Sequence, residues 1–110
     1  MTDEVNLKEL KTWARRSNFS YYGSVQEGVQ ILFGEKPYSE KISQEQFTKL
    51  LDHFKNKVVD CGTSRDNRSL DSLGDWLEKN VCKRSIASYV GAILVAEGFA
   101  KRKKSFIDFL

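Results

Sequence analysis

Residues that mark common functional sites are scarce in this chain. Its 110 residues include only two cysteines and one histidine. Cys61 and Cys82 lie in no CxxC pair and no Cys/His cluster, so we expect the reduced thiols of a cytoplasmic protein. His53 has no second histidine and no cysteine at ligand spacing, and we therefore predict neither a metal site nor another cofactor.

Long hydrophobic runs are absent as well. The longest apolar stretch, residues 90 to 96, is far too short to span a bilayer. The first residues carry neither the basic nor the apolar region of a secretory signal. We therefore expect a protein that associates with no membrane.

The motifs of common catalytic sites are missing too. The sequence contains no Walker loop, no GxGxxG, no GxSxG and no HExxH. The segment that begins at Cys61 invites comparison with the phosphate loop of tyrosine phosphatases, in which five residues separate the cysteine from an arginine. Position 67 is Asn67 and the arginines stand at 65 and 68, so the match fails. We predict that the protein is not an enzyme.

What is present suits one compact domain. Hydrophobic residues make up 40 % of the chain and charged residues 30 %, with a formal net charge of +3. We expect one domain over residues 1–110, with an N-terminal part (1–42) and a C-terminal part (43–110). The small net charge does not identify a partner, but residues 101–104 form a local run of four cations.

The N-terminal part is predicted as a helix followed by a β-hairpin. Asn6 can cap a helix that carries Trp13 on its apolar face and ends near Ser17. Two aromatic or β-branched runs follow, with a glycine-containing turn between them, which indicates a hairpin. These runs are residues 19–22 and 29–33.

The C-terminal part is predicted as three helices and a second hairpin. The helices have capping residues at their starts, and a glycine follows the last one. We expect them at residues 44–56 behind a capping box of Ser43 and Gln46, from Ser69 or Asp71 to Asn80, and from Ser85 to Glu97 before Gly98. Residues 57–61 either continue the first helix or form a short extended piece, and 62–69 form a loop. The hairpin strands are expected at 99–101 and 106–109.

This order of elements resembles the winged helix-turn-helix superfamily. The resemblance covers about residues 43–110 and rests on the segments LGDWLEKN, VCKR, SIASYVGAILVAEGF and AKRKKSFIDF. They read as a helix, a short turn, a second helix that ends in Glu-Gly, and a hairpin with a cationic tip. The resemblance implies a three-helix unit with a C-terminal β-hairpin wing, and an α+β fold overall.

The resemblance also implies binding to double-stranded DNA, with a regulatory role in transcription or an accessory role. In this superfamily the second helix of the motif usually enters the major groove, and the wing usually touches the backbone or the minor groove. The protein would then lie in the cytoplasm, or in the nucleoid or nucleus when bound to DNA. Carried over to this chain, the contacts are Lys83, Arg84, Ser85, Ser88, Lys101, Arg102, Lys103 and Lys104.

The helix expected at 85–97 differs from a base-reading helix. Its body contains no Arg, Lys, Asn or Gln, so backbone contacts should dominate over base contacts. Its inward stripe is predicted to consist of Ile86, Val90, Ile93, Leu94 and Glu97. The cations at 101–104 are equally well read as a solvated hairpin tip.

Two other hypotheses remain open from the sequence. Rows of small residues on the same helix permit close approach of another helix of the domain or of a protein partner. A protein-interaction module, either a homo-oligomer or a subunit of a larger complex, would use Ala87, Gly91, Ala92 and Val95. Alternatively the N-terminal part binds a ligand through an exposed tyrosine, Tyr21 or Tyr22, beside Arg15 and Arg16.

Overall fold

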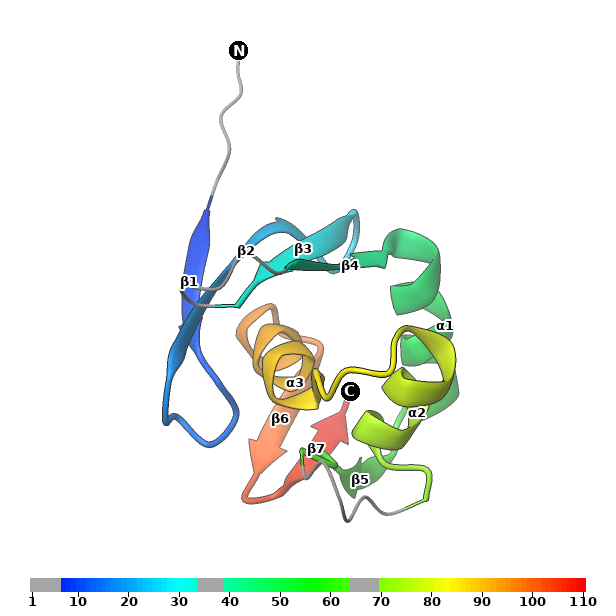
Figure 1. The fold of residues 1–110 in the computed structure, drawn as a ribbon. Coiled ribbons are helices and arrows are strands. Elements are labelled where there is room, and N and C mark those ends of the chain that lie inside the picture. The colour runs from blue at the N-terminus through cyan, green and yellow to red at the C-terminus, as the bar shows by residue number, and fades with distance from the viewer. Residues whose placement is uncertain (1–6, 34–38, 64–69) are drawn as a thin grey trace.

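The computed structural model describes residues 7–33, 39–63 and 70–110. Residues 1–6, 34–38 and 64–69, among them Asn6, Arg65, Arg68 and Ser69, lie outside the described residues. Within the described part, strands come first, and three helices alternate with further strands after them (Figure 1). The order is β1 (Lys8–Lys11), β2 (Asn18–Ser24), β3 (Gly28–Leu32), β4 (Ser39–Ser43), α1 (Gln44–Phe54), β5 (Val58–Asp60), α2 (Leu73–Asn80), α3 (Ala87–Ala96), β6 (Ala100–Lys103) and β7 (Phe106–Phe109).

The first four strands form an antiparallel sheet in which each strand pairs with the next along the chain. Side chains along a strand point alternately to the two faces of the sheet. On one face the alternation buries Phe19 and Tyr21 of β2, Val29 and Ile31 of β3, and Ile42 of β4. That face packs on the core. The predicted hairpin is therefore confirmed as β2 and β3, in the middle of a larger sheet.

The predicted N-terminal helix is wrong, because its residues form strand β1 and a turn. Lys8 pairs with Tyr21, and Leu10 pairs with Phe19, in antiparallel register. In so short a segment the apolar spacing fits a strand as well as a helix, and pairing with β2 decides between them. Arg15, inside the expected helix, has φ 62° and lies in the turn to β2.

The first helix begins where its capping box predicts. The Gln46 backbone nitrogen donates to Ser43 Oγ at 3.1 Å, and the Ser43 nitrogen donates to Gln46 Oε1 at 2.9 Å. The helix ends at Phe54, and residues 58–60 form the extended piece that was one of the two expectations. Asn56, with φ 60°, reverses the chain between them.

The other two helices begin at different residues from those expected. Ser72 caps α2, since its Oγ accepts from the Asp75 nitrogen at 3.0 Å, while Asp71 has φ 62°, outside the extended region of an N-cap. Ile86 precedes α3, with no side-chain cap, and Ser85 donates instead to the Thr63 carbonyl at 3.5 Å.

The C-terminal hairpin is confirmed, with β6 continuing to Lys103. It joins β5 in an antiparallel sheet of order β5-β7-β6. The two strands are joined through Lys104 and Ser105. Gly98, with φ 87°, follows the end of α3, as expected for a residue that terminates a helix.

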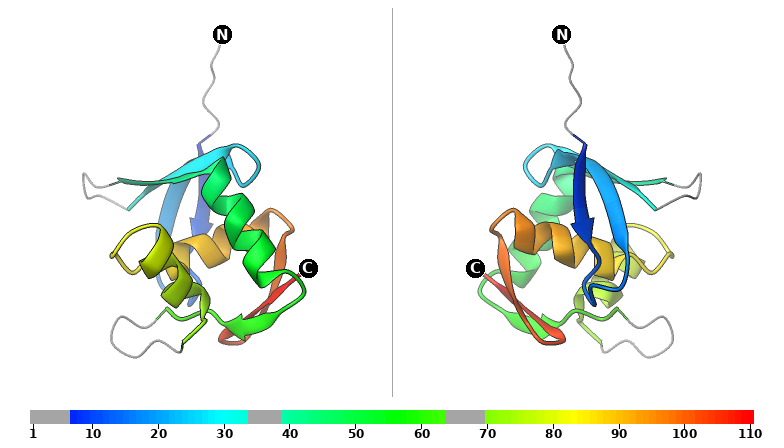
Figure 2. Two further views of the ribbon diagram at one scale, coloured as in Figure 1. Left: turned by 90° about the vertical axis from the view of Figure 1, so that its right-hand side faces the viewer. Right: turned by 90° about the vertical axis from the view of Figure 1, so that its left-hand side faces the viewer.

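Helix α3 lies between the two sheets, and α1 and α2 flank it on a third side (Figures 1 and 2). The inward stripe is confirmed for Ile86, Val90, Ile93 and Leu94, which are at most 1 % exposed. Ala87 and Gly91, on another face, are buried as well. A helix that is apolar on most of its faces must be covered on most of them. One core therefore joins the N-terminal sheet to the C-terminal part.

None of the described helices combines the length and the apolar character needed to cross a membrane.

Candidate nucleic-acid interface

The N-terminal sheet covers the face of α3 that the superfamily resemblance assigned to the DNA groove. The Ser88 carbonyl accepts a hydrogen bond from the Trp13 backbone nitrogen at 2.9 Å. The next residue, Tyr89, packs edge-on against Phe19 and Phe33, with ring centroids 5.1 and 4.8 Å apart. Ser88 is thus half-buried under the β1–β2 turn. Base reading by α3 would require this contact to be removed.

Trp13 packs against the small residues of α3. A Cβ atom placed on Gly91 would lie 2.8 Å from Trp13 Cε3 and 3.0 Å from Cys61 Sγ. Ala87 is buried, and its carbonyl accepts from Cys61 Sγ at 3.7 Å. Of the four residues predicted for a protein interface, only Ala92 and Val95 remain partly exposed. The close approach that these small residues permit is therefore used within the chain.

The wing, residues 100–109, contains the four predicted cations in different settings. Lys103 pairs with Asp108 at 3.1 Å, and the Arg102 guanidinium lies over the Trp13 ring, 5.5 Å from its centroid. Lys101 and Lys104 are exposed, and neither forms an ion pair with any acidic side chain of the described residues. These two lysines are the cations of the wing best placed to meet a polyanion.

A second cationic turn lies beside the tip of the wing. The β1–β2 turn, residues 12–17, is closed by hydrogen bonds from the Thr12 nitrogen to the Ser17 carbonyl and from the Arg15 nitrogen to the Thr12 carbonyl, at 2.9 and 2.7 Å. Arg15 and Arg16 are exposed. This turn lies next to the β6–β7 tip (Figure 2), since Trp13 Nε1 donates to the Lys104 carbonyl at 3.1 Å.

A small groove of about 170 Å³ lies between the β1–β2 turn, Arg102 of β6 and α3. Its walls combine apolar side chains of β1 and α3 with basic side chains of the turn and the wing. It is lined by Leu10, Lys11, Thr12, Trp13, Arg15, Ala92, Val95, Ala96 and Arg102. Sequence analysis missed this juxtaposition, because nothing local in the sequence relates Trp13 to a carbonyl 91 residues further along the chain.

The remaining predicted contacts lie at the turn between α2 and α3. Arg84 pairs with Glu40 of β4 at 3.9 Å, and its guanidinium lies over Phe33, 5.8 Å from the ring centroid. Its charge is thus partly compensated within the chain. Lys83 is exposed, while Ser85 is half-buried and donates to the Thr63 carbonyl. The structure leaves Lys83 as the more accessible cation of this pair.

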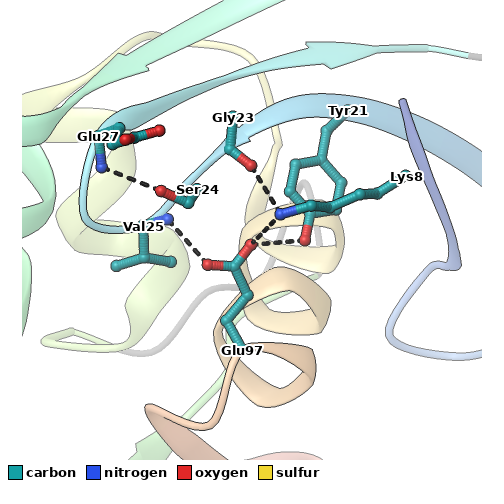
Figure 3. A network of polar contacts seen from close by, with 7 residues as sticks. All are labelled: Lys8, Tyr21, Gly23, Ser24, Val25, Glu27 and Glu97. Atoms are coloured by element: carbon teal, nitrogen blue, oxygen red, sulfur yellow. Dashed lines mark hydrogen bonds and ion pairs between the residues drawn. The ribbon is translucent and has the colours of Figure 1, made fainter. Parts of the chain in front are cut away.

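The N-terminal sheet is fastened to the end of α3 by the carboxylate of Glu97 (Figure 3). Glu97 Oε2 accepts from the Tyr21 hydroxyl at 2.6 Å and from Lys8 Nζ at 3.5 Å, and Oε1 accepts from the Val25 nitrogen at 2.9 Å. Lys8 also donates to the Gly23 carbonyl at 2.9 Å. Burial, with the bond to Glu97, raises the pKa of Tyr21 well above its usual value. This polar cluster ties two elements together.

Both cysteines carry free thiols. Burial raises the pKa of Cys61 to about 12, and burial also raises the pKa of Cys82. A thiol with a raised pKa is a poor nucleophile at neutral pH. In the ranges 7–33, 39–63 and 70–110, no three His, Cys, Asp or Glu side chains gather to hold a metal ion.

Comparison of the chain with protein families, with curated proteins and with solved structures yields no match. The functional argument therefore rests on the geometry described above.

Proposed function

We propose that residues 43–110 form a winged-helix module that binds double-stranded DNA through phosphate contacts of its wing. Two features support this proposal. The elements follow the order helix, strand, helix, short turn, helix and hairpin, and the first of these strands pairs with the last. The hairpin also carries cations along β6 and at its tip, residues 101–104, and the tip is where a wing meets the DNA backbone in the superfamily.

The observation that carries the proposal is a pair of exposed lysines, on a fixed hairpin, that form no ion pair with the described residues. Lys101 and Lys104 are exposed, and the wing is held to the body of the protein by the hydrogen bond from Trp13 to the Lys104 carbonyl. A lysine that neutralises a phosphate releases a counterion, so binding should weaken steeply as salt rises. A fixed hairpin also loses little conformational entropy on binding.

The N-terminal sheet and the β1–β2 turn cover part of α3, which supports binding to the DNA backbone over reading of the bases. Ser88 and Tyr89 on the expected groove face of α3 are packed under Trp13 and Phe19, so this face of the helix is not free to enter the major groove. Phosphate contacts position a protein on DNA without reading its sequence. The proposed role is accordingly an accessory one on DNA, in the cytoplasm, nucleoid or nucleus, with little sequence preference.

The test is a titration of duplex DNA with the protein at several salt concentrations, in which fluorescence anisotropy measures the binding. The double variant Lys101→Gln with Lys104→Gln should bind more weakly, and the slope of log affinity against log salt should fall by about 1.8, since each lost phosphate contact removes about 0.9. The control variant Lys49→Gln with Lys55→Gln removes the same charge from α1 and its C-cap, which border the open end of the hairpin and not its tip, and should keep the wild-type slope. Equal slopes and affinities for all three proteins would refute the proposal.

A further inference from the structure

We propose that the β1–β2 turn is a second phosphate-contacting element, which grips the backbone of double-stranded DNA together with the wing. The inference rests on the proposed function and adds Arg15 and Arg16 to the interface. These residues lie outside the segment that resembles a winged helix. The DNA-binding surface would then be built from two hairpin tips that are 91 residues apart at their point of contact.

Trp13 holds the two tips in one fixed arrangement. Its indole nitrogen donates to the Lys104 carbonyl at 3.1 Å, its backbone nitrogen donates to the Ser88 carbonyl at 2.9 Å, and its ring supports the guanidinium of Arg102. The indole is only 6 % exposed. Because this side chain is anchored to both α3 and the wing, the cations of the turn and of the wing keep their spacing before DNA arrives.

The charges of the two tips are available to a ligand. Arg15, Arg16 and Lys104 are exposed, and across the described residues none of them forms an ion pair with an acidic side chain. Lys101 lies further from the tip, on β6 opposite Asp108. By contrast, Lys103 is paired with Asp108. Three like charges held on adjacent tips repel one another, and an anionic ligand that spans both tips relieves that repulsion.

Each tip also places a cation where the backbone favours glycine. Arg15 has φ 62° and Lys104 has φ 59°, both in the left-handed region that costs least for glycine. Strained backbone of this kind concentrates at functional sites. Of the four non-glycine residues with positive φ in the described part of the chain, these two are the cations, and the two turns that contain them lie side by side (Figure 2).

The chemistry of the surface favours a duplex over a single strand. Single-strand binders present aromatic rings on which bases stack, whereas the Trp13 ring is buried and covered by Arg102. Phe106, an exposed aromatic residue of β7, pairs with Lys103 and thus lies on the face of the hairpin opposite to Arg102 and Ile107. A duplex presents regularly spaced phosphates to rigid tips and requires no stacking.

The test compares the full-length wild type with the double variant Arg15→Gln with Arg16→Gln on the same DNA duplex. We expect weaker binding and a slope of log affinity against log salt lower by about 1.8, as for two lost phosphate contacts. The Lys49→Gln with Lys55→Gln control should keep the wild-type slope. Circular dichroism confirms the fold of each variant, and Arg16→Gln alone, whose backbone is unstrained, should lower the slope by about 0.9.

The outcomes distinguish this inference from the function on which it rests. An unchanged slope in the turn variants, together with a lower slope in the Lys101/Lys104 variant, would overturn the role of the turn alone. Unchanged slopes in both would overturn the proposed function as well. Binding to single-stranded DNA or to RNA as tight as to the duplex would overturn the assignment of double-stranded DNA as the ligand.

Discussion

At the scale of single residues, Glu97 shows how a carboxylate can be held in an unfavourable position. It follows the last residue of α3, where the negative end of the helix dipole disfavours a negative charge. Its side chain is only 13 % exposed. Three donors from the N-terminal sheet offset both penalties, since hydrogen bonds to a charged group are stronger than neutral ones. Glu97 thus ties the sheet to the helix.

Replacing Glu97 should therefore lower the stability of the whole domain. Glu97→Ala leaves the Val25 nitrogen and the Tyr21 hydroxyl without an acceptor, and we expect the free energy of unfolding to fall by about 2–4 kcal/mol. Tyr21→Phe removes one of the three bonds and should cost about 1–2 kcal/mol. Urea denaturation measures both. A Glu97→Ala protein as stable as wild type would show that the cluster contributes nothing.

The buried thiol of Cys61 predicts a pH dependence in the alkaline range. Its pKa in the folded state is raised to about 12 from an ordinary value of 9.0, mainly by burial. Between these two values the unfolded chain loses the thiol proton and the folded chain keeps it. The stabilisation is complete below the ordinary pKa, and the free energy of unfolding falls as pH rises above it, by about 1.4 kcal/mol per pH unit for this one proton.

The measurement is denaturant unfolding at several pH values between about 9 and 11, a window set by that shift. Cys61→Ala should show a shallower decline of stability with pH than wild type, whatever its stability at neutral pH. Tyr21, whose pKa is also raised, contributes its own decline at higher pH and serves as an internal comparison. Identical slopes for wild type and Cys61→Ala would contradict the prediction.

At the scale of elements, the packing of Trp13 against Gly91 of α3 gives a larger side chain at this position two opposing effects on stability. Gly91→Ala should gain about 1 kcal/mol of helix propensity at an interior position. The new methyl group, however, would lie 2.8 Å from the Trp13 ring, which is held at both ends and has little freedom to move. Overpacking of this kind costs about 1–3 kcal/mol, so we expect a net loss of stability. A lower melting temperature checks this, and a higher one would contradict it.

The wing shows a conflict between stability and function at Lys104. Glycine should relieve the left-handed backbone at this turn and raise stability by about 0.5–1 kcal/mol. The same change removes a proposed phosphate contact, so Lys104→Gly should be more stable and bind duplex DNA more weakly. Asn56→Gly makes a similar backbone change after α1 and should leave binding unchanged. Undiminished DNA affinity in Lys104→Gly would count against the role of this lysine.

At the scale of the whole molecule, residues 43–110 depend on the N-terminal sheet to cover α3. Phe19, Tyr21 and Ile31 of the sheet belong to the same core as Val90 and Leu94 of α3. Without the sheet, α3 would expose the faces that now contact Trp13 and Phe19, a cost of about 25 cal/mol for each Å² of apolar surface. The two parts that the sequence suggests share one core, and we expect them to fold as one unit.

This dependence predicts that a fragment of residues 43–110 does not fold alone. Its two-dimensional NMR spectrum should show poor dispersion, in contrast to that of the full chain, because the faces of α3 are uncovered. Adding the separate N-terminal segment, residues 1–42, should restore dispersion if the two pieces bind each other. A well-dispersed spectrum of the fragment by itself would show that the sheet is dispensable for folding.

The sequence by itself determined the features that depend on a few neighbouring residues. The capping box of Ser43 and Gln46 places the start of α1, Gly98 ends α3, and the two hairpin signals place β2 with β3 and β6 with β7. The spacing of apolar residues also identified the inward stripe of α3. These features follow from local hydrogen bonds, backbone preference and periodicity, which are properties of a short segment.

Only the tertiary structure decided which elements meet. Residues 8–11 form a strand because β2 offers an edge to pair with, and the small residues of α3 are buried because Trp13 fills the space above Gly91. The juxtaposition of Arg15 with Lys104 depends on one hydrogen bond between distant parts of the chain. Such contacts are selected by the packing of the whole core, and no short segment of the sequence contains the information that specifies them.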